Sequence, residues 1–145
     1  MNVLILDDQA SARIMLKRII VDAQSGLDIR EFAAPNDALE WCRGNRPDLI
    51  IVDYSMPDMD GVQFVKNLRR MHQHANVPVI LVTVTVDDEM RVTAFDAGID
   101  DVMTKPVVAK ELQRRARRLL AVREHAVALE ARVRELEARA SDRAA

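Results

Sequence analysis

Aromatic residues are scarce in this chain of 145 residues, where they make up only 3% of the sequence. The core must therefore be built mainly from Val, Ile, Leu, Met and Ala, a composition typical of buried parallel strands covered by helices. A hydrophobic content of 49% is enough for one domain of ordinary size with an appendage. With so few rings, recognition of a ligand by aromatic stacking is not expected.

The chain also has one cysteine, Cys42, and no long apolar run. A lone cysteine cannot form an internal disulfide, and no metal-type spacing surrounds it, so we expect a partly buried structural thiol. The apolar run near the N-terminus, Val3 to Leu6, is too short for a signal peptide or a membrane span. We therefore expect a cytoplasmic protein without a membrane partner.

Charge divides the chain into two unlike parts, although the net charge is only -2. Residues 1–105 contain 11 Lys and Arg against 17 Asp and Glu, whereas residues 106–145 contain 10 against 6. In the basic tail the cations alternate with glutamates, which is the pattern of a solvated helix surface. The sequence therefore predicts no direct binding to nucleic acid.

Five short β-rich runs alternate with segments of helical periodicity. The runs are 2–6, 27–32, 49–52, 79–82 and 101–103, and the helical segments between them are 10–23, 35–44, 61–71 and 87–97. In the first helical segment, Ile14, Leu16, Ile19 and Ile20 form one broad apolar face. Strands joined through helices run parallel, with helices on both faces of the sheet. This order predicts an α/β fold of the doubly wound (βα)5 type.

Polar residues stand at the carboxyl ends of four of these strands, where open parallel sheets bind their ligands. They are Asp7 and Asp8, Asp53, Thr83 and Lys105. Each has an ordinary interpretation by itself, as a helix cap, a β-branched strand residue or a surface charge. Together they fall in the order that phosphoryl chemistry requires. Three carboxylates on one rim repel each other, so the arrangement also indicates a Mg2+ site.

Four segments of the sequence carry a resemblance to a known family. They are Leu4-Ile5-Leu6-Asp7-Asp8, the D-x-x-M-P-x-x-D-G stretch from Asp53 to Gly61, Val82-Thr83, and Met103-Thr104-Lys105-Pro106. Through them, residues 1–122 resemble the receiver domain of bacterial two-component response regulators. The resemblance implies a flavodoxin-like sheet of order 2-1-3-4-5, in which the first and third strands are neighbours.

The same resemblance implies roles for the acidic residues. Asp53 would take a phosphoryl group from the phosphohistidine of a histidine kinase or phosphotransfer protein. Asp8 and Asp53, with the backbone carbonyl of Ser55, would hold Mg2+, and Asp7 would act mostly through water. Such a module catalyses only its own phosphotransfer and dephosphorylation, so an independent enzyme is not expected.

Thr83 and Lys105 would contact the phosphoryl oxygens, and the sequence departs from the family pattern near both. Val102 stands where many receivers have an aromatic residue that moves with the threonine. Val84 replaces a residue that is usually small, so it is expected to shield the acyl phosphate or restrict access to it. Two of the histidines, His72 and His74, follow the third helical segment in a polar stretch and are expected at the surface.

The C-terminal segment has no Gly or Pro from Val107 onward and is rich in good helix formers. Its apolar residues recur at spacings of three and four, at positions 119, 122, 126, 129, 133, 136 and 140, and Leu112 extends them by one heptad. This heptad pattern predicts a parallel homodimer through residues 112–140, with a single amphipathic helix as the alternative. A helix over residues 108–140 is about 50 Å long, so residues 123–145 are expected to project from the domain.

The residues that flank this heptad pattern give a mixed signal for pairing. With Leu119 at position a, Arg132 and Glu137 would attract across a parallel dimer, whereas Arg118 and Arg123 would repel. In similar regulators such a helix leads to a cyclic-di-GMP phosphodiesterase, a diguanylate cyclase or another effector. We therefore expect an output domain or effector beyond this helix, and this chain looks like a fragment of such a protein.

Two functions remain open from the sequence. The first is a two-component switch that is phosphorylated at Asp53 and passes its state through the C-terminal helix. The second is a receiver-like scaffold that dimerises without phosphorylation, which the valines at positions 84 and 102 would permit. The intact acidic, hydroxyl and lysine positions favour the switch.

Overall fold

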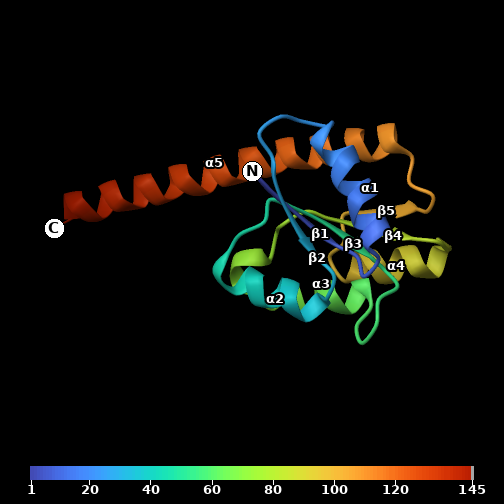
Figure 1. Cartoon of the computed structure of the whole chain (residues 1–145). Coiled ribbons are helices and arrows are strands. Elements are labelled where there is room, and N and C mark those ends of the chain that lie inside the picture. Colours follow the sequence, from blue (N-terminus) through green and yellow to red (C-terminus); the bar gives the residue numbers. More distant parts are fainter. Residues whose placement is uncertain (145) are drawn as a thin grey trace.

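The computed structural model describes residues 1–144 and alternates strands with helices along the chain (Figure 1). The strands are β1 (Asn2–Leu6), β2 (Asp28–Phe32), β3 (Leu49–Asp53), β4 (Val79–Thr83) and β5 (Asp101–Thr104). The helices are α1 (Ala10–Val21), α2 (Pro35–Gly44), α3 (Gly61–Arg69), α4 (Asp88–Asp96) and α5 (Ala109–Ala144), with a 3-10 turn η1 (His72–His74) after α3. Within residues 1–144, no helix has both the length and the apolar character needed to cross a membrane.

All five strands are parallel and lie in the order β2-β1-β3-β4-β5, which confirms the predicted topology. In this register Leu6 pairs with Val52, and Asp53 pairs with Val82. The carboxyl ends of β1, β3 and β4 therefore meet at one edge of the sheet.

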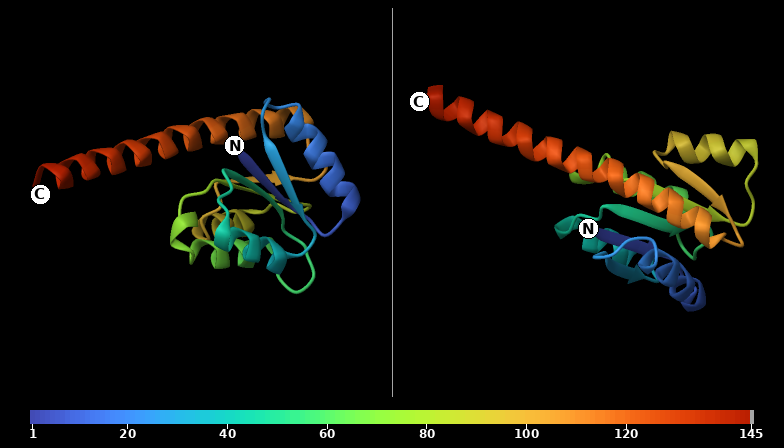
Figure 2. Two further views of the ribbon diagram at one scale, coloured as in Figure 1. Left: turned by 60° about the vertical axis from the view of Figure 1, so that its left-hand side comes forward. Right: turned by 90° about the horizontal axis from the view of Figure 1, so that it is seen from above.

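Two hydrophobic cores cover the two faces of the sheet, and β1 shows how one strand serves both. Val3 and Ile5 pack with buried residues of α1 and α5, whereas Leu4 and Leu6 pack with buried residues of α2, α3 and α4. The views in Figures 1 and 2 show α1 and α5 together on one side of the sheet. Because both faces are buried, the central strands are apolar at almost every position, as expected for a parallel sheet.

The predicted apolar face of α1 was wrong at one position. Leu16 and Ile20 are buried, but Ile14 is 58% exposed. Ile14 lies two residues before Leu16, which is about 200° around the helix, on the exposed face of α1. The helix also ends at Val21, and Gly26 lies in the turn beyond it with a φ of +76°.

The expectation that His74 lies at the surface was also wrong. The turn η1 folds its ring under α2, where it is fully buried and Nε2 lies 2.5 Å from the backbone carbonyl of Cys42. Arg69 donates to the backbone carbonyl of His74 at 2.8 Å and holds the turn in place. Cys42 is fully buried as well, and burial raises the pKa of its thiol to about 11. That thiol is therefore structural rather than reactive.

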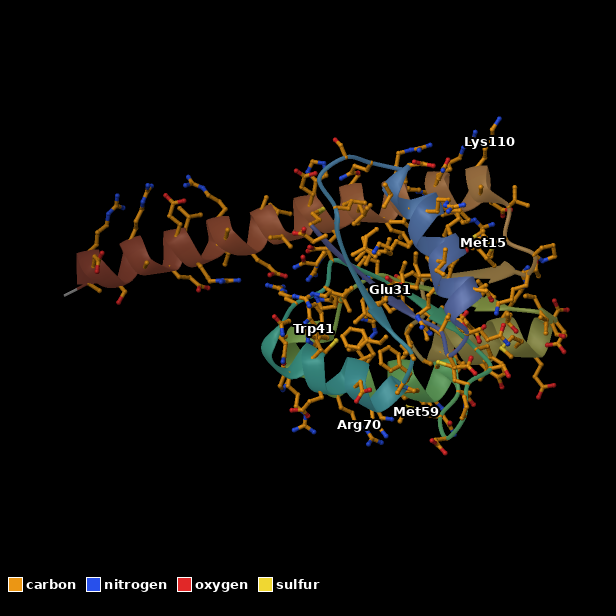
Figure 3. All side chains as sticks on the ribbon, in the orientation of Figure 1. Met15, Glu31, Trp41, Met59, Arg70 and Lys110 are labelled. Atoms are coloured by element: carbon orange, nitrogen blue, oxygen red, sulfur yellow. The ribbon has the colours of Figure 1, made fainter. Side chains whose placement is uncertain are left out.

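The last helix, α5, extends well beyond the rest of the molecule (Figure 1). Its 36 residues correspond to about 54 Å of helix. Its first half packs on the sheet through Leu112, Ala116 and Leu120, all at most 1% exposed. The assignment of Leu112 to the dimer pattern was therefore wrong, because its side chain fills the domain core. In Figure 3, the side chain of Lys110 points away from the body at the start of the same helix.

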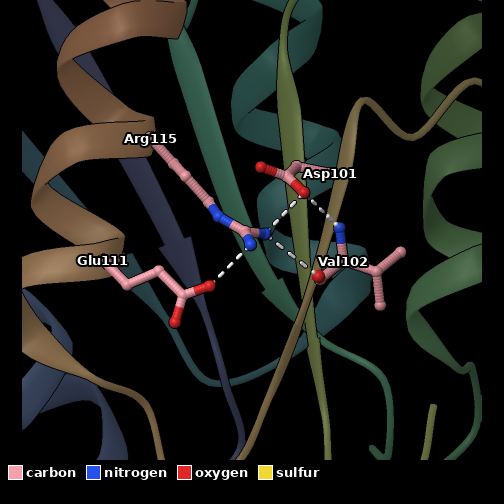
Figure 4. A network of polar contacts seen from close by, with 4 residues as sticks. All are labelled: Asp101, Val102, Glu111 and Arg115. Carbon is pink, nitrogen blue, oxygen red and sulfur yellow. Dashed lines mark hydrogen bonds and ion pairs between the residues drawn. The ribbon is translucent and has the colours of Figure 1, made fainter.

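Polar contacts fix α5 against the edge strand β5. Arg115 Nη1 donates to Asp101 Oδ1 at 2.6 Å and to the Val102 carbonyl at 3.2 Å, while Nη2 pairs with Glu111 Oε1 at 2.5 Å (Figure 4). One guanidinium thereby joins the start of β5 to two successive turns of α5. The helix leaves the body from a fixed position as a result.

Gly61, at the start of α3, allows a close backbone approach beneath the site. A Cβ atom there would lie 2.7 Å from the carbonyl oxygen of Asp53 and 2.7 Å from Leu81 Cδ1. Asp60 caps the helix just before it, in a capping box with Gln63. The helix start and the end of β3 are therefore in direct contact.

We predict that Gly61→Ala lowers the free energy of unfolding by about 1–3 kcal/mol, because the added methyl group overlaps backbone atoms that cannot move independently. Gly44→Ala is the matched control, since a Cβ there has nothing within 4 Å. Gly44 is in helical conformation, so the control should be neutral or stabilise by up to about 1 kcal/mol. Urea unfolding of both variants checks the difference, and equal effects would contradict the close approach.

Candidate functional site

Three aspartates converge at the carboxyl edge of the sheet because β1 and β3 are neighbours. Asp7 and Asp8 follow β1, and Asp53 is the last residue of β3. Each offers a carboxylate oxygen, and these oxygens all lie within 4.8 Å of one another. Asp7 and Asp53 are buried, whereas Asp8 is exposed. The predicted acidic cluster is thus assembled, with one of its members open to solvent.

Asp7 is held by its own loop. Its Oδ1 accepts a hydrogen bond from the backbone N–H of Gln9 at 2.9 Å, and its carbonyl accepts one from Arg13 at 2.8 Å. Its other carboxylate oxygen, Oδ2, is buried and has no hydrogen-bond partner among the described residues. Burial of a carboxylate oxygen without a hydrogen-bond partner destabilises the fold, so a cation bound at this atom would be stabilising.

Lys105 is the one cationic side chain among residues 1–144 that pairs with these carboxylates. Its Nζ lies 2.7 Å from Asp53 Oδ1 and 3.7 Å from Asp7 Oδ2. The backbone N–H of Lys105 donates to the carbonyl of Thr83 at 2.8 Å, which aligns the ends of β4 and β5. The lysine is placed by the strand pairing and bridges the two buried carboxylates.

Thr83 closes the site on the side of β4. It is 4% exposed, and its hydroxyl donates to the carbonyl of Thr85 at 3.3 Å and accepts from the Thr85 N–H at 3.4 Å. Both bonds are long, so they restrain the hydroxyl only weakly. Ser55 lies in the exposed loop after β3 and lines the same pocket. All six predicted site residues are therefore brought together at one edge.

The pocket over these residues has a volume of about 1050 Å³ and extends toward α4. Gln9, Lys66 and Met90 line it as well, and the sequence analysis did not single them out. Gln9 could have been found, because it directly follows the acidic pair. Lys66 and Met90 gave no local signal, since each reaches the pocket only through the packing of α3 and α4. Val84 is 73% exposed at the pocket wall, whereas Val102 is 4% exposed and fills the core.

The electrostatics of the cluster oppose ionisation of Asp53. Burial raises the pKa of its carboxyl, and the charges of Asp7 and Asp8 raise it further, against the opposing effect of Lys105. Burial lowers the pKa of Lys105, but the hydrogen bond and charge of Asp53 outweigh this effect, so its pKa is raised. At neutral pH the lysine is a cation, and the carboxylates are held together at a cost.

A family model for the response regulator receiver domain matches residues 3–117. The chain belongs to this family. The match includes the three aspartates of the site together with Thr83 and Lys105.

Relatives of this receiver domain are longer than the chain itself. It is 41% identical over 139 residues to the cyclic di-GMP phosphodiesterase response regulator RpfG of Xanthomonas campestris, which covers 96% of this chain and 37% of that protein. It is 36% identical over 124 residues to the KDP operon transcriptional regulatory protein KdpE of Escherichia coli, covering 86% and 52%. The chain thus spans about half or less of the length of these relatives.

Solved structures agree with this assignment. The chemotaxis protein CheY4 of Vibrio cholerae superposes with a TM-score of 0.75 at 30% identity, covering 81% of this chain and 97% of that structure. The receiver domain of the Francisella response regulator 1452 gives a TM-score of 0.74 at 29% identity, covering 83% and 96%. The unmatched part of this receiver corresponds in size to the projecting end of α5.

We predict that Asp53→Asn raises the free energy of unfolding at pH 7.5 without divalent cations, because it removes a buried charge beside two carboxylates. The pKa of Asp53 is raised in the folded state, so its ionisation destabilises the fold above that pKa. The gain should therefore be full above the folded pKa and disappear as pH falls toward the ordinary aspartate value of about 3.9. Urea unfolding in EDTA at several pH values checks this, and a gain that grows on acidification would contradict it.

Proposed function

We propose that this receiver is a phosphoacceptor switch whose acceptor is Asp53. The observation that carries the proposal is the position of Asp53 at the end of β3, with Lys105 Nζ 2.7 Å from its carboxylate and an open pocket above it. A histidine kinase or phosphotransfer protein supplies the phosphoryl group. A carboxylate oxygen of Asp53 bonds to phosphorus as the bond from phosphorus to the donor's imidazole nitrogen breaks, which yields an acyl phosphate and a free imidazole.

A Mg2+ ion fits the donor set beside this acceptor. Asp8 and Asp53, with the backbone carbonyl of Ser55, supply oxygen ligands of the kind the ion prefers, and Asp7 acts mostly through water. Buried Asp7 Oδ2 supports this assignment, because it has no hydrogen-bond partner among the described residues and its ion-pair partner, Lys105 Nζ, is 3.7 Å away and lies closer to Asp53. The ion would neutralise charge on the phosphoryl oxygens.

The remaining charge on the phosphoryl group falls to Thr83 and Lys105. Lys105 already lies on Asp53, so its ammonium group needs little movement to reach an oxygen attached to that carboxylate. The Thr83 hydroxyl is held only by two long bonds to Thr85, so it can turn toward the new group. Positioning and neutralisation of this kind are the main requirements of phosphoryl transfer.

The state of the site would be passed on through α5, from a receiver unit of residues 1–122 to the helical extension predicted for residues 123–145, of which residue 145 lies outside the described part of the chain. Beyond the body, the exposed face of α5 carries an apolar stripe in heptad register. Val122, Leu129, Val133 and Leu136 are 62%, 66%, 51% and 48% exposed. A second copy of the same stripe, in a parallel coiled coil, is the occupant that this period favours.

The repulsion between Arg118 and Arg123 that opposed such a dimer is reduced in the folded chain. Arg123 turns away from the stripe and is buried, with Nε 3.5 Å from Asp48 Oδ1. Its charge therefore faces its own domain instead of a partner helix. The attractive pair of Arg132 and Glu137 lies beyond the body, where both residues are exposed.

The type of output domain that follows such a helix is inferred from how far the similarity to each relative extends along this chain. Similarity to the phosphodiesterase response regulator RpfG spans 139 residues, whereas similarity to the transcriptional regulator KdpE spans 124. The similarity to RpfG covers 96% of this chain, so it reaches into the helical extension. We therefore favour an output related to cyclic di-GMP over an output that binds DNA.

The phosphorylation test compares intact masses after incubation with acetyl phosphate or a phosphorylated kinase. We predict one phosphoryl adduct on the native chain in Mg2+, no adduct on Asp53→Ala, and a large loss of adduct in EDTA or in Asp8→Asn. Asp58→Asn is the matched control, because Asp58 is exposed in the adjacent loop and its φ of 70° suits asparagine. No adduct on the native chain from either donor would favour the scaffold that works without phosphorylation.

The dimer test uses sedimentation equilibrium. We predict that Leu129→Gln with Leu136→Gln shifts the chain toward monomer by at least tenfold in dissociation constant, because both residues lie on the exposed stripe. Ala131→Gln with Ala138→Gln is the matched control, since these exposed positions lie on the opposite face of the same turns. Equal behaviour of the two double variants would contradict pairing through this stripe.

A further inference from the structure

A second pocket, of about 360 Å³, lies where α5 leaves the body. It is at the amino end of the sheet, opposite the edge that carries Asp53. Three separate segments line it: the loop after α2 with Arg46, the region of η1 with His72 and Asn76, and α5 with Arg123 and Arg134. None of these residues belongs to the phosphorylation site.

Arg123 is the unusual member of this pocket. Its side chain is only 2% exposed, and its sole ion pair within the described residues is the 3.5 Å approach of Nε to Asp48. Among residues 1–144, neither its Nε nor its Nη2 has a hydrogen-bond partner. Arg46 Nε, on the facing loop, is also buried without one. Buried cationic donors without acceptors are costly, so the pocket lacks an acceptor that its donors require.

The net charge of the pocket also favours an anion. Three guanidinium groups line it against one carboxylate, that of Glu130. This carboxylate is already engaged, with Oε2 2.7 Å from Arg46 Nη2 and 3.6 Å from Arg134 Nη2. The hydrogen bond from Arg46 lowers the pKa of Glu130, so it stays ionised. When Asp48, the ion-pair partner of Arg123, is counted as well, three guanidinium groups face two carboxylates and one positive charge remains in excess.

The same charges act on a neighbouring group. Burial lowers the pKa of His74, and the charges of Arg46, Arg123 and Arg69 lower it further, against the opposing effect of the hydrogen bond with the Cys42 carbonyl. The ring is therefore neutral at physiological pH, and it adds no further cation. The excess charge belongs to the arginines.

We infer that this pocket binds a small tetrahedral oxyanion, either inorganic phosphate or the phosphate group of a monoester, through Arg46, Arg123 and Arg134. Guanidinium groups match phosphate oxygens in pairs of hydrogen bonds. The donors reach the pocket from two sides, which suits an anion with oxygens in all directions better than a planar carboxylate. The anion would join the loop after α2 to α5 at the point where the helix leaves the body.

The test is a titration of the full chain with inorganic phosphate, without Mg2+ and at constant ionic strength. Binding is monitored through the chemical shifts of the backbone amides in NMR spectra. Saturable shifts are expected at residues 72–76 and 123–134 and around Arg46. Affinity should fall at least tenfold in Arg46→Gln with Arg134→Gln. Arg132→Gln, on the same helix but outside the pocket, should keep the native affinity.

Other outcomes overturn the inference. Shifts confined to the surroundings of Lys105 would assign phosphate to the phosphorylation site, and equal losses in the Arg132→Gln control would indicate a general charge effect. Acetate that binds as tightly as phosphate would exclude a tetrahedral site. If the double variant does not fold, Arg134→Gln alone serves, because its side chain is 70% exposed and supports no core contact. Failure here leaves the proposed phosphoacceptor intact, because phosphorylation of Asp53 is tested separately by intact mass.

Discussion

Three carboxylates held within 4.8 Å of one another, with a single lysine among them, are the constraint on which the rest of this receiver depends. Such an arrangement is unstable by itself, since burial and like charges both oppose ionisation. The fold provides the stabilisation that holds it together. The central strands are packed against hydrophobic cores on both faces of the sheet, which fixes their backbone. The acidic side chains therefore cannot separate to relieve their repulsion.

The same packing connects this edge to the projecting helix. The buried face of α5 packs on the sheet face that carries Ile51 of β3, and Arg115 ties the helix to β5, the strand that leads to Lys105. A change at Asp53 or Lys105 therefore acts on strands that α5 contacts directly. The exposed stripe of α5 begins where these contacts end, so the body and the proposed pairing region share one continuous helix.

The sequence predicted the site well because its logic is topological. Once strands are parallel and joined through helices, their carboxyl ends must meet, and the sheet order then brings Asp7, Asp8 and Asp53 together. Residue type and position along the chain placed these side chains at strand ends, and no side-chain packing was needed for that step. The family resemblance supplied the strand order.

Features that depend on packing between helices could not be predicted in the same way. Leu112 fits both a heptad pattern and a core position, and only the docking of α5 decides between them. His74 and Arg123 are polar residues that become buried because η1 and α5 close over the amino end of the sheet. Ile14 is the converse, an apolar residue left exposed because α1 turns that face outward. In each case the spacing along the chain was compatible with both outcomes.

The acyl phosphate is proposed to form on the carboxylate of Asp53, and chemical trapping of that acyl phosphate is the most direct test. Borohydride reduces an aspartyl phosphate to homoserine, so reduction of the phosphorylated chain followed by peptide mass mapping locates the acceptor. The account predicts homoserine at position 53 and unmodified aspartate at positions 7 and 8. Homoserine at either of those positions, or at none of the three in a chain that carries a phosphoryl adduct, would contradict it.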